Sequence, residues 1–254
     1  MYQKEVFSRY KSNSQIIRVL SENWFDTQMY CPYCLNEEIE KFPNNNKSGD
    51  FYCIRCKNIF ELKSSNKAFS MKVIDGEYFT MINCIKLNKT PNFSLLNYDK
   101  KDLVVKNLFI IPKFFVSESI IEKRNPLSEA AKRKGWIGCN ILLQRIPEEG
   151  RVQIINNEKI IPKETVSKII NKMYFLHNKS YETRGWTSDI LVCIEKLSKK
   201  EFTLEDIYKF ESYLKKLHPN NNFIKEKIRQ QLQILRDNNI LEFLNNGKYK
   251  FKRS

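Results

Sequence analysis

Short apolar runs separated by polar turns fill the first 180 residues of the chain. In residues 14–25 apolar side chains recur at helical spacing, at Ile16, Ile17, Leu20 and Trp24, and predict a short amphipathic helix. Residues 166–175 are a second candidate helix, and residues 118–138 are expected to be rich in loops. Apolar runs bounded by turn residues, among them a turn at residues 44–49, predict strands at residues 51–52, 59–63, 91–98 and 104–111.

From Thr183 onward the pattern changes to nearly continuous helix. Residues 186–197 and 222–237 each predict a helix, and another begins after Thr203, a suitable N-cap that acidic residues follow. Residues 240–244 and 248–251 are strand-like and flank Asn-Asn-Gly at 245–247, a strong hairpin signal. Three helices followed by a basic hairpin are the order of a winged helix. We therefore expect one domain over residues 1–180 and a second over residues 181–254.

The composition favours a folded protein with a polyanionic partner. The hydrophobic content of 41% supports a core, and no apolar run approaches the roughly 18 residues that a membrane span needs. The first residues show no secretory signal, so a cytoplasmic location is expected. The net charge is +15; residues 181–254 carry 15 Lys and Arg against 10 Asp and Glu, which leaves +10 for residues 1–180. Coding bias toward lysine explains the charge equally well, but both parts of the chain are basic.

Four of the seven cysteines form two C-x-x-C pairs, Cys31 with Cys34 and Cys53 with Cys56, separated by eighteen residues. This spacing is typical of zinc ribbons, where four thiolates hold one structural zinc ion tetrahedrally. Four unmetallated buried cysteines are the alternative. The other cysteines lie among apolar residues, and the chain has only two histidines, so catalysis by a cysteine or serine with a histidine base is not expected.

A second pattern overlaps the cysteines: Asp50, ten residues, then Glu61, Leu62 and Lys63. Side chains alternate along a strand, so Glu61 and Lys63 share one face. If Asp50 ends the neighbouring strand, two carboxylates converge, as a hard magnesium ion requires, with Lys63 beside the attacking water. A surface Glu–Lys pair is the alternative. The zinc site would then brace the loop between the catalytic strands.

The predicted helix at 222–237 has an apolar stripe and an opposite polar face suited to DNA. Gln and Arg on such a face can contact base edges, and a basic hairpin can contact phosphates. A solvated helix face with a basic tail is the alternative. Trp136, in a loop flanked by glycines, is either a base contact or an ordinary core residue. The DNA-binding candidates are Trp136, Lys227, Arg229, Gln230, Gln233, Lys248 and Lys250.

These features together resemble the DpnI family of methyl-directed restriction endonucleases. The segments that carry the resemblance keep their order over essentially the whole chain. They are YKSNSQ at 10–15, the two cysteine pairs, DFYC at 50–53, FELKS at 60–64, GWIGCN at 135–140, RGW at 184–186, FTLED at 202–206 and IKEKIRQQLQILRD at 224–237.

The resemblance implies an α+β chain, with a PD-(D/E)XK restriction-endonuclease-like catalytic domain that carries an inserted four-cysteine zinc site and a C-terminal winged helix. Asp50 and Glu61 match the family's Mg²⁺-binding carboxylates, Leu62 lies at the same metal site, and Lys63 matches its lysine. Gly49 replaces the proline of the motif. The implied substrate is double-stranded DNA at GATC with N6-methyladenine, and Trp136 matches the aromatic residue near the methyl group.

Two other functions remain open. A non-catalytic regulator with a zinc ribbon and a winged helix would tolerate Asp50→Ala, and a nuclease for other DNA would keep the active site and differ in specificity. We expect a protein that acts as a monomer on the nucleoid in the bacterial cytoplasm, without a protein partner or a membrane.

Overall fold

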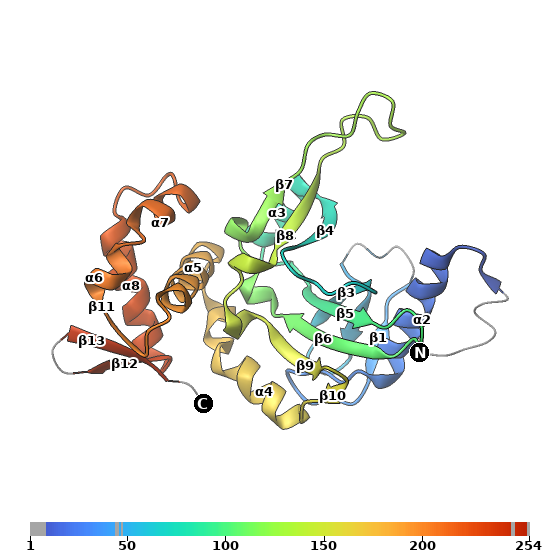
Figure 1. Cartoon of the computed structure of the whole chain (residues 1–254), viewed down its shortest axis with the longest axis horizontal. Helices are drawn as coiled ribbons and strands as arrows, with labels where there is room; N and C mark the ends of the chain where they lie inside the picture. The colour runs from blue at the N-terminus through green and yellow to red at the C-terminus, as the bar shows by residue number, and fades with distance from the viewer. Residues whose placement is uncertain (1–8, 44–45, 47, 245–246, 253–254) are drawn as a thin grey trace. The chain divides into compact units, whose positions relative to one another are not determined.

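The computed structural model describes residues 9–43, 46, 48–244 and 247–252 (Figure 1). They divide into two compact units that alternate along the sequence. Unit 1 comprises Met1–Met71, Leu87–Lys113 and Glu149–Met173, and unit 2 comprises Lys72–Lys86, Phe114–Glu148 and Tyr174–Ser254. The predicted turns at 44–49 and 245–247 lie partly outside the described residues, at positions 44–45, 47 and 245–246.

A sheet that has seven strands in the described residues forms the centre of unit 1, in the order β1-β2-β3-β5-β6-β9-β10. Within the same residues its neighbours are antiparallel, except that β3 pairs with β5 in parallel. A parallel pair needs a crossover, and here residues 66–91 supply it. The strands are β1 (Ile39–Lys41), β2 (Phe51–Cys53), β3 (Ile59–Ser65), β5 (Asn92–Tyr98), β6 (Val105–Ile111), β9 (Val152–Asn156) and β10 (Lys159–Ile160).

Helices α2 (Asn13–Gln28) and α4 (Lys163–Lys172) pack on this sheet, α2 against β3 and α4 against β9. The Phe25 ring on α2 lies 4.7 Å from Phe51 and 6.4 Å from Phe60, and all three side chains are fully buried. The predicted helix at 14–25 and the four predicted strands are confirmed as α2, β2, β3, β5 and β6. The predicted helix at 166–175 exists but begins earlier, at Lys163.

Unit 2 contains a small antiparallel sheet in the order β4-β8-β7. It consists of β4 (Lys72–Glu77), β8 (Gly138–Leu142) and β7 (Ile121–Lys123), and α3 (Tyr78–Lys86) contacts all three strands. The connection over residues 124–137 extends beyond the sheet as a long loop (Figure 1). The prediction of a loop-rich segment at 118–138 is right for this connection and wrong for β7.

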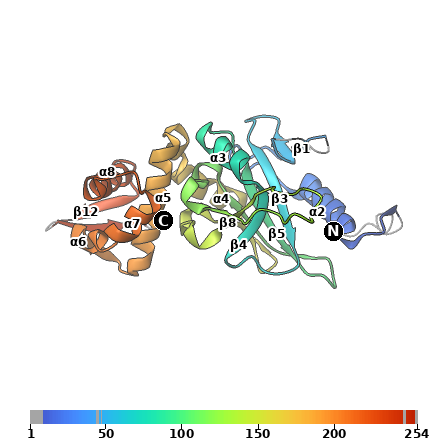
Figure 2. The same cartoon turned by 90° about the horizontal axis from the view of Figure 1, so that it is seen from above.

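The C-terminal part of unit 2 has the predicted helices and hairpin, with two further elements. Thr203 caps α6 through a capping box with Asp206, as the sequence predicted for its N-cap role. The strand order β11-β13-β12 joins the hairpin to a strand before α6. Figure 2 shows β12 beside α8. The elements are α5 (Tyr181–Leu197), β11 (Glu201–Thr203), α6 (Leu204–Tyr208), α7 (Glu211–Leu217), α8 (Ile224–Asp237), β12 (Leu241–Leu244) and β13 (Lys248–Phe251).

Short 3-10 helices join several of these elements. They are η1 (Lys113–Phe115), η2 (Glu118–Ile120), η3 (Leu143–Arg145), η4 (Glu148–Gly150) and η5 (Tyr174–Asn178). In the part of the chain that the structure describes, every helix is too short or too polar to cross a membrane.

Candidate functional site

The two cysteine pairs form turns with the same backbone hydrogen bonds. In the first turn the N–H of Cys31 donates to the carbonyl of Asn36, and the N–H of Leu35 donates to that of Cys31. The second turn repeats this pattern between Cys53, Asn58 and Lys57. Leu35 and Lys57 both have φ of 58°, and this left-handed conformation reverses the backbone after each cysteine pair. Two equivalent turns therefore present two thiols each.

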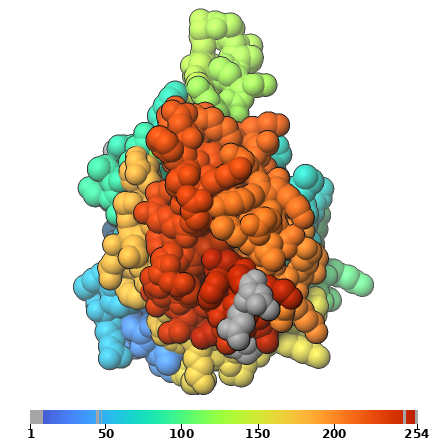
Figure 3. Space-filling model, turned by 90° about the vertical axis from the view of Figure 1, so that its left-hand side faces the viewer, coloured from blue at the N-terminus to red at the C-terminus, as the bar shows by residue number. Residues whose placement is uncertain are grey.

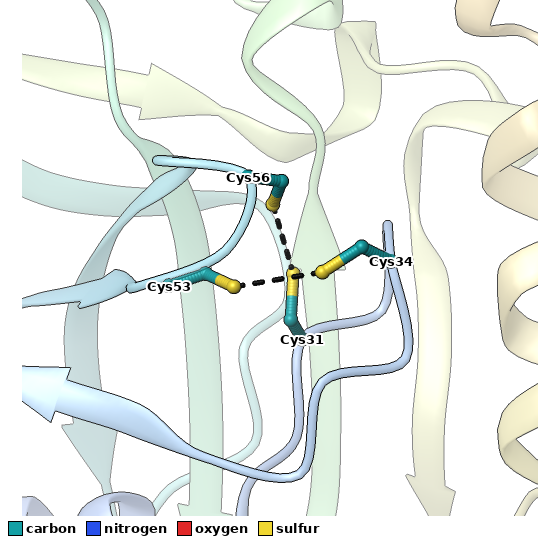
Figure 4. A group of neighbouring side chains, drawn as sticks. All are labelled: Cys31, Cys34, Cys53 and Cys56. Atoms are coloured by element: carbon teal, nitrogen blue, oxygen red, sulfur yellow. Dashed lines mark hydrogen bonds between the residues drawn. The ribbon is translucent and has the colours of Figure 1, made fainter.

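The four thiols point toward one another and fit a tetrahedral zinc ion (Figure 4). Sγ of Cys31 lies 3.4 Å from Sγ of Cys56, and Sγ of Cys34 lies 3.5 Å from Sγ of Cys53. Zinc–sulfur bonds of about 2.3 Å place tetrahedral sulfurs about 3.8 Å apart, close to these separations. The cluster is able to bind a metal such as zinc, and all its positions are occupied by protein ligands.

Two of these thiols ionise less readily than a free cysteine does, and a bound cation would offset this. Burial raises the pKa of Cys31 and of Cys34, because a thiolate is poorly solvated there. Burial acts most strongly on Cys56 as well, but hydrogen bonds with Asn58, Cys31 and Cys34 together outweigh it and lower the pKa of Cys56 to about 7. A divalent metal ion would supply the charge that stabilises all four thiolates.

The second turn also joins β2, which directly follows Asp50, to β3. Cys53 ends β2 and Cys56 lies in the connection to β3, which carries Glu61 and Lys63. The first turn is tied to the sheet by Tyr33, whose hydroxyl donates to the side chain of buried Asn92 on β5 at 2.5 Å. Asn92 in turn donates to the carbonyl of Ile59 on β3. The cysteine cluster thus braces the β2–β3 connection.

Asp50 immediately precedes β2, at the end of the strand that lies beside Glu61. Its backbone N–H donates to the carbonyl of Phe60 at 2.9 Å, and its Oδ2 accepts the N–H of Leu62 at 2.8 Å. On β3, Lys63 and Glu61 form an ion pair, while the neighbouring Phe60 side chain is fully buried. The predicted alternation is confirmed, and the sheet brings Asp50 next to the Glu61–Lys63 segment.

Gly49 is required by the close packing of the chain before Asp50. A Cβ at this position would lie 2.6 Å from Cγ2 of Ile59 and 3.0 Å from the carbonyl oxygen of Phe60, and φ is +155°. Any side chain would force these atoms apart, and proline cannot adopt this φ. The glycine in place of the motif's proline therefore follows from how closely β3 approaches.

Two charged residues that the sequence did not single out lie within electrostatic reach of Asp50. Burial raises the pKa of Asp50, Glu22 raises it further, and the Leu62 N–H, Lys63 and Lys41 lower it. Glu22, on α2, pairs with Lys41 on β1 at 2.8 Å. Nothing in the spacing of these residues distinguishes them from surface charges, so only the fold identifies them.

The donor set at Asp50 and Glu61 fits a hard cation. Both side chains offer carboxylate oxygens, and the Glu61 side chain is 26% exposed, so hydrated ions can reach it. The N–H of Leu62 fixes the orientation of Asp50, and the backbone carbonyl of Leu62 belongs to the same strand segment. These residues suit magnesium rather than zinc, since they provide no sulfur or imidazole.

In the C-terminal segment, α8 has the predicted buried stripe, formed by Ile224, Ile228, Leu232 and Leu235. The predicted DNA-binding residues Arg229, Gln230 and Gln233 are exposed, and Lys227 is half-buried. Gln231 was not singled out; it is fully buried and accepts a hydrogen bond from Thr187 on α5.

Some of the exposed side chains on α8 and the hairpin are already engaged. Arg229 donates to the hydroxyl of Tyr208, and Gln233 donates to Asp237. Lys248 and Lys250 are both exposed on β13, and Lys248 lies 3.7 Å from Glu201. Figure 3 shows the orange to red residues of this segment as a continuous surface.

Trp136 is half-buried at the base of the long loop of unit 2. The guanidinium of Arg133 lies 4.5 Å from the centre of the indole ring. The backbone N–H of Trp136 donates to the carbonyl of Arg133. The N–H of Leu127 donates to the carbonyl of Trp136 at 2.9 Å, closing the base of the loop. These contacts fix the position of Trp136, whose side chain is partly exposed. Trp136 belongs to unit 2, whereas Asp50, Glu61 and Lys63 belong to unit 1.

Two protein-family models match the chain. One, described as "DpnI: Dam-replacing family", matches residues 1–179. The other, described as "DpnI_C: Dam-replacing HTH domain", matches residues 182–251. The second match identifies the C-terminal segment as a helix-turn-helix domain, which is a DNA-binding fold.

Proposed function

Because the chain belongs to the DpnI Dam-replacing family, which implies a restriction nuclease with a DNA-binding HTH domain, we propose its substrate and its chemistry. The protein is a type II endonuclease that hydrolyses double-stranded DNA at GATC carrying N6-methyladenine. The observation that carries this proposal is the approach of Asp50 to the Glu61–Lys63 segment across β2 and β3. The boundary between a nuclease domain and a winged helix is proposed at residues 180 and 181.

The hydrolysis would take place beside β3. Asp50, Glu61 and the Leu62 carbonyl would hold Mg²⁺, which supplies charge stabilisation of the scissile phosphate and of the departing oxygen. Lys63 would orient the attacking water and favour its loss of a proton. Asp50 is kept in position by the Leu62 N–H, so little reorganisation is needed when the phosphate binds.

Methylation would be read through Trp136. Burial of a methyl group against an aromatic wall contributes on the order of 1 kcal/mol. An unmethylated amino group facing the same wall would leave an unpaired N–H, at a cost of roughly 1–3 kcal/mol. A monomer carries one Trp136, so each bound protein applies these contributions to one of the two adenines of the GATC palindrome.

The winged helix would contribute a second set of contacts. Lys227, Arg229, Gln230 and Gln233 on α8 would enter a major groove, and Lys248 and Lys250 would contact phosphates. The basic balance in both parts of the chain supports contacts from both. We propose that the protein acts as a monomer.

The test uses the purified protein and Asp50→Ala on adenine-methylated and unmethylated copies of one plasmid with GATC sites. Discrete fragments from the methylated plasmid alone, absent with EDTA or with Asp50→Ala, are expected. Cutting of both plasmids would retain the nuclease and remove the methyl requirement. Tight binding without any cutting would support the regulator instead.

A further inference from the structure

The small sheet of unit 2 has one covered face and one open face. Side chains alternate along β8, so Cys139 and Ile141 share a face, and both are fully buried. Lys123 on β7 pairs with Cys139 on β8, and its Nζ lies 4.9 Å from the centre of the Phe79 ring on α3, so α3 packs at this face. Gly138 and Asn140 are buried too and belong to the opposite face, which is open at Ile74 on β4 and Glu122 on β7.

Trp136 lies on the open face. A Cβ at Gly138 would point to that face, and it would meet Cζ3 and Cη2 of Trp136 at 2.8 and 2.9 Å. The six-membered ring of the indole is therefore packed against the glycine, two residues from Asn140. Ile74 is the neighbour of Asn140 on β4 and is 64% exposed, so this face is accessible next to the indole.

Glu122 is the neighbour of Asn140 on β7 and shares the open face. Its Oε2 accepts hydrogen bonds from Nδ2 of Asn140 at 2.6 Å and from Nζ of Lys72 at 3.0 Å. These two donors lower the pKa of Glu122, so the side chain stays ionised. Its Oε1 accepts no hydrogen bond from any residue that the structure describes, and the side chain is 41% exposed.

A fixed carboxylate is unusual on a surface that binds a polyanion, because phosphates repel it. The repulsion is offset when the free oxygen meets a donor on a base edge. In the major groove such donors are the exocyclic amino groups of cytosine and adenine, and Glu is a known acceptor for cytosine N4–H. Methylated adenine also retains one N–H.

The spacing on the sheet favours cytosine. Positions 138 and 140 of β8 are about 6.8 Å apart along the strand. Two base steps of about 3.4 Å each span the same distance. In GATC the cytosine follows the adenine by two steps on the same strand.

We propose that Glu122, held by Asn140 and Lys72, is a specificity-determining residue that accepts a hydrogen bond from the N4 amino group of the GATC cytosine beside Trp136. The inference rests on the proposed function, since it takes its substrate from there. Glu122 would thus add a polar base contact to the apolar contact proposed for Trp136. The open face of the β4-β8-β7 sheet would then lie against the major groove.

The test measures binding of the full-length protein to three short duplexes in EDTA, and initial cleavage rates with Mg²⁺. The duplexes carry methylated GATC, the same site with its final C·G pair changed to T·A, and unmethylated GATC. Glu122→Gln should lower the preference for C·G over T·A by roughly 5- to 150-fold and leave the methyl preference intact. Glu158→Gln, which removes another surface carboxylate paired with a lysine, should behave as wild type.

Other outcomes are distinguishable. Loss of the methyl preference alone would keep Glu122 as the acceptor and move its donor to the N–H of methylated adenine, which overturns the assignment to cytosine. An unchanged preference in Glu122→Gln, or an equal loss on all three duplexes, would overturn the inference. So would an equal fall in thermal stability and in affinity for all three duplexes in both Glu122→Gln and Lys72→Met, because the pair would then be structural. Binding preference without cleavage would defeat the nuclease proposal and leave this one standing.

Discussion

In unit 1 all candidate metal ligands lie within residues 31–63, whereas the open face of unit 2 combines residues from β4, β7 and β8, spread over residues 72–142. The residues proposed to cut DNA follow one another along β2 and β3, which a turn with two cysteines joins. The residues proposed to contact bases come together only because three separate strands pair in a defined register. The proposed metal site is thus encoded locally, and the proposed base-reading site is encoded by tertiary structure.

The two regions should respond differently to loss of the cysteine cluster. Cys53→Ser leaves three sulfurs for the metal, so we expect loss of bound zinc and of nearly all cleavage. The metal content of the purified protein, measured by mass spectrometry, and the cleavage rate check this. Cys84→Ser, on α3, is the control and should retain both. Full activity in Cys53→Ser without bound metal would contradict the bracing role.

A change of Lys63 should separate cutting from reading. Lys63→Met removes the proposed orienter of the attacking water, and cleavage should fall by about 10²- to 10⁴-fold. Binding to methylated DNA without metal should hardly change, because the proposed base contacts at Trp136 and on α8 belong to unit 2. Single-turnover rates and equilibrium binding measure the two effects, with Lys67→Met as an exposed control on the same segment. An equal loss of binding and rate would argue against the assigned role.

A change of Trp136 should have the reverse effect. Trp136→Ala removes the aromatic side chain proposed to contact the methyl group, and the preference for methylated over unmethylated DNA should fall about fivefold, the equivalent of about 1 kcal/mol. Trp136→Phe retains a wall and should keep most of the preference. The ratio of cleavage rates on the two DNAs measures this. A preference that survives in Trp136→Ala would place methyl recognition elsewhere.

The capping box of α6 offers a test of stability within the C-terminal segment. Thr203→Ala removes the side chain that accepts the Asp206 N–H at 3.3 Å, and the free energy of unfolding should fall by about 1 kcal/mol. Urea denaturation followed by circular dichroism measures it. Thr165→Ala, in the first turn of α4, provides a comparison outside the capping box. No difference between the two variants would mean that the box contributes little.

The smallest expected effect is at the hairpin. Lys250→Gln removes one proposed phosphate contact, so the slope of log affinity against log salt should become shallower by about 1. Affinity should weaken to a similar extent on all sequences. Titrations at several salt concentrations measure this slope. A sequence-dependent loss would instead make Lys250 a base contact.

The amount that the sequence predicts differs between the regions for a physical reason. The C-x-x-C spacing specifies its own turn, and strand periodicity alone places Glu61 and Lys63 on one face. The stripe on α8 was equally readable, since helical spacing determines which side packs. Glu122, Asn140 and Lys72 carry no such pattern, because their proximity depends on the pairing of β7 and β4 with β8. Glu22 near Asp50 was missed for the same reason, as it comes from a separate helix.

The resemblance of the chain to known nucleases located Trp136 but not its surroundings. Its packing on Gly138 and its contact with Arg133 require the coordinates of the loop base. A single domain boundary in the sequence also does not predict that residues 72–86 belong to unit 2. These residues lie in the crossover between β3 and β5, which are both strands of unit 1. Because each unit consists of separate segments of the chain, one boundary cannot divide the sequence into the two units.

The central claim is that cutting and methyl reading use separate sets of residues in one chain. The most direct test measures Asp50→Asn in parallel on methylated and unmethylated GATC duplexes, by binding in EDTA and by cleavage with Mg²⁺, with Asp26→Asn as an exposed control from the same unit. We predict that Asp50→Asn does not cut either duplex and prefers the methylated one as strongly as wild type does. Loss of that preference together with cleavage would contradict the separation.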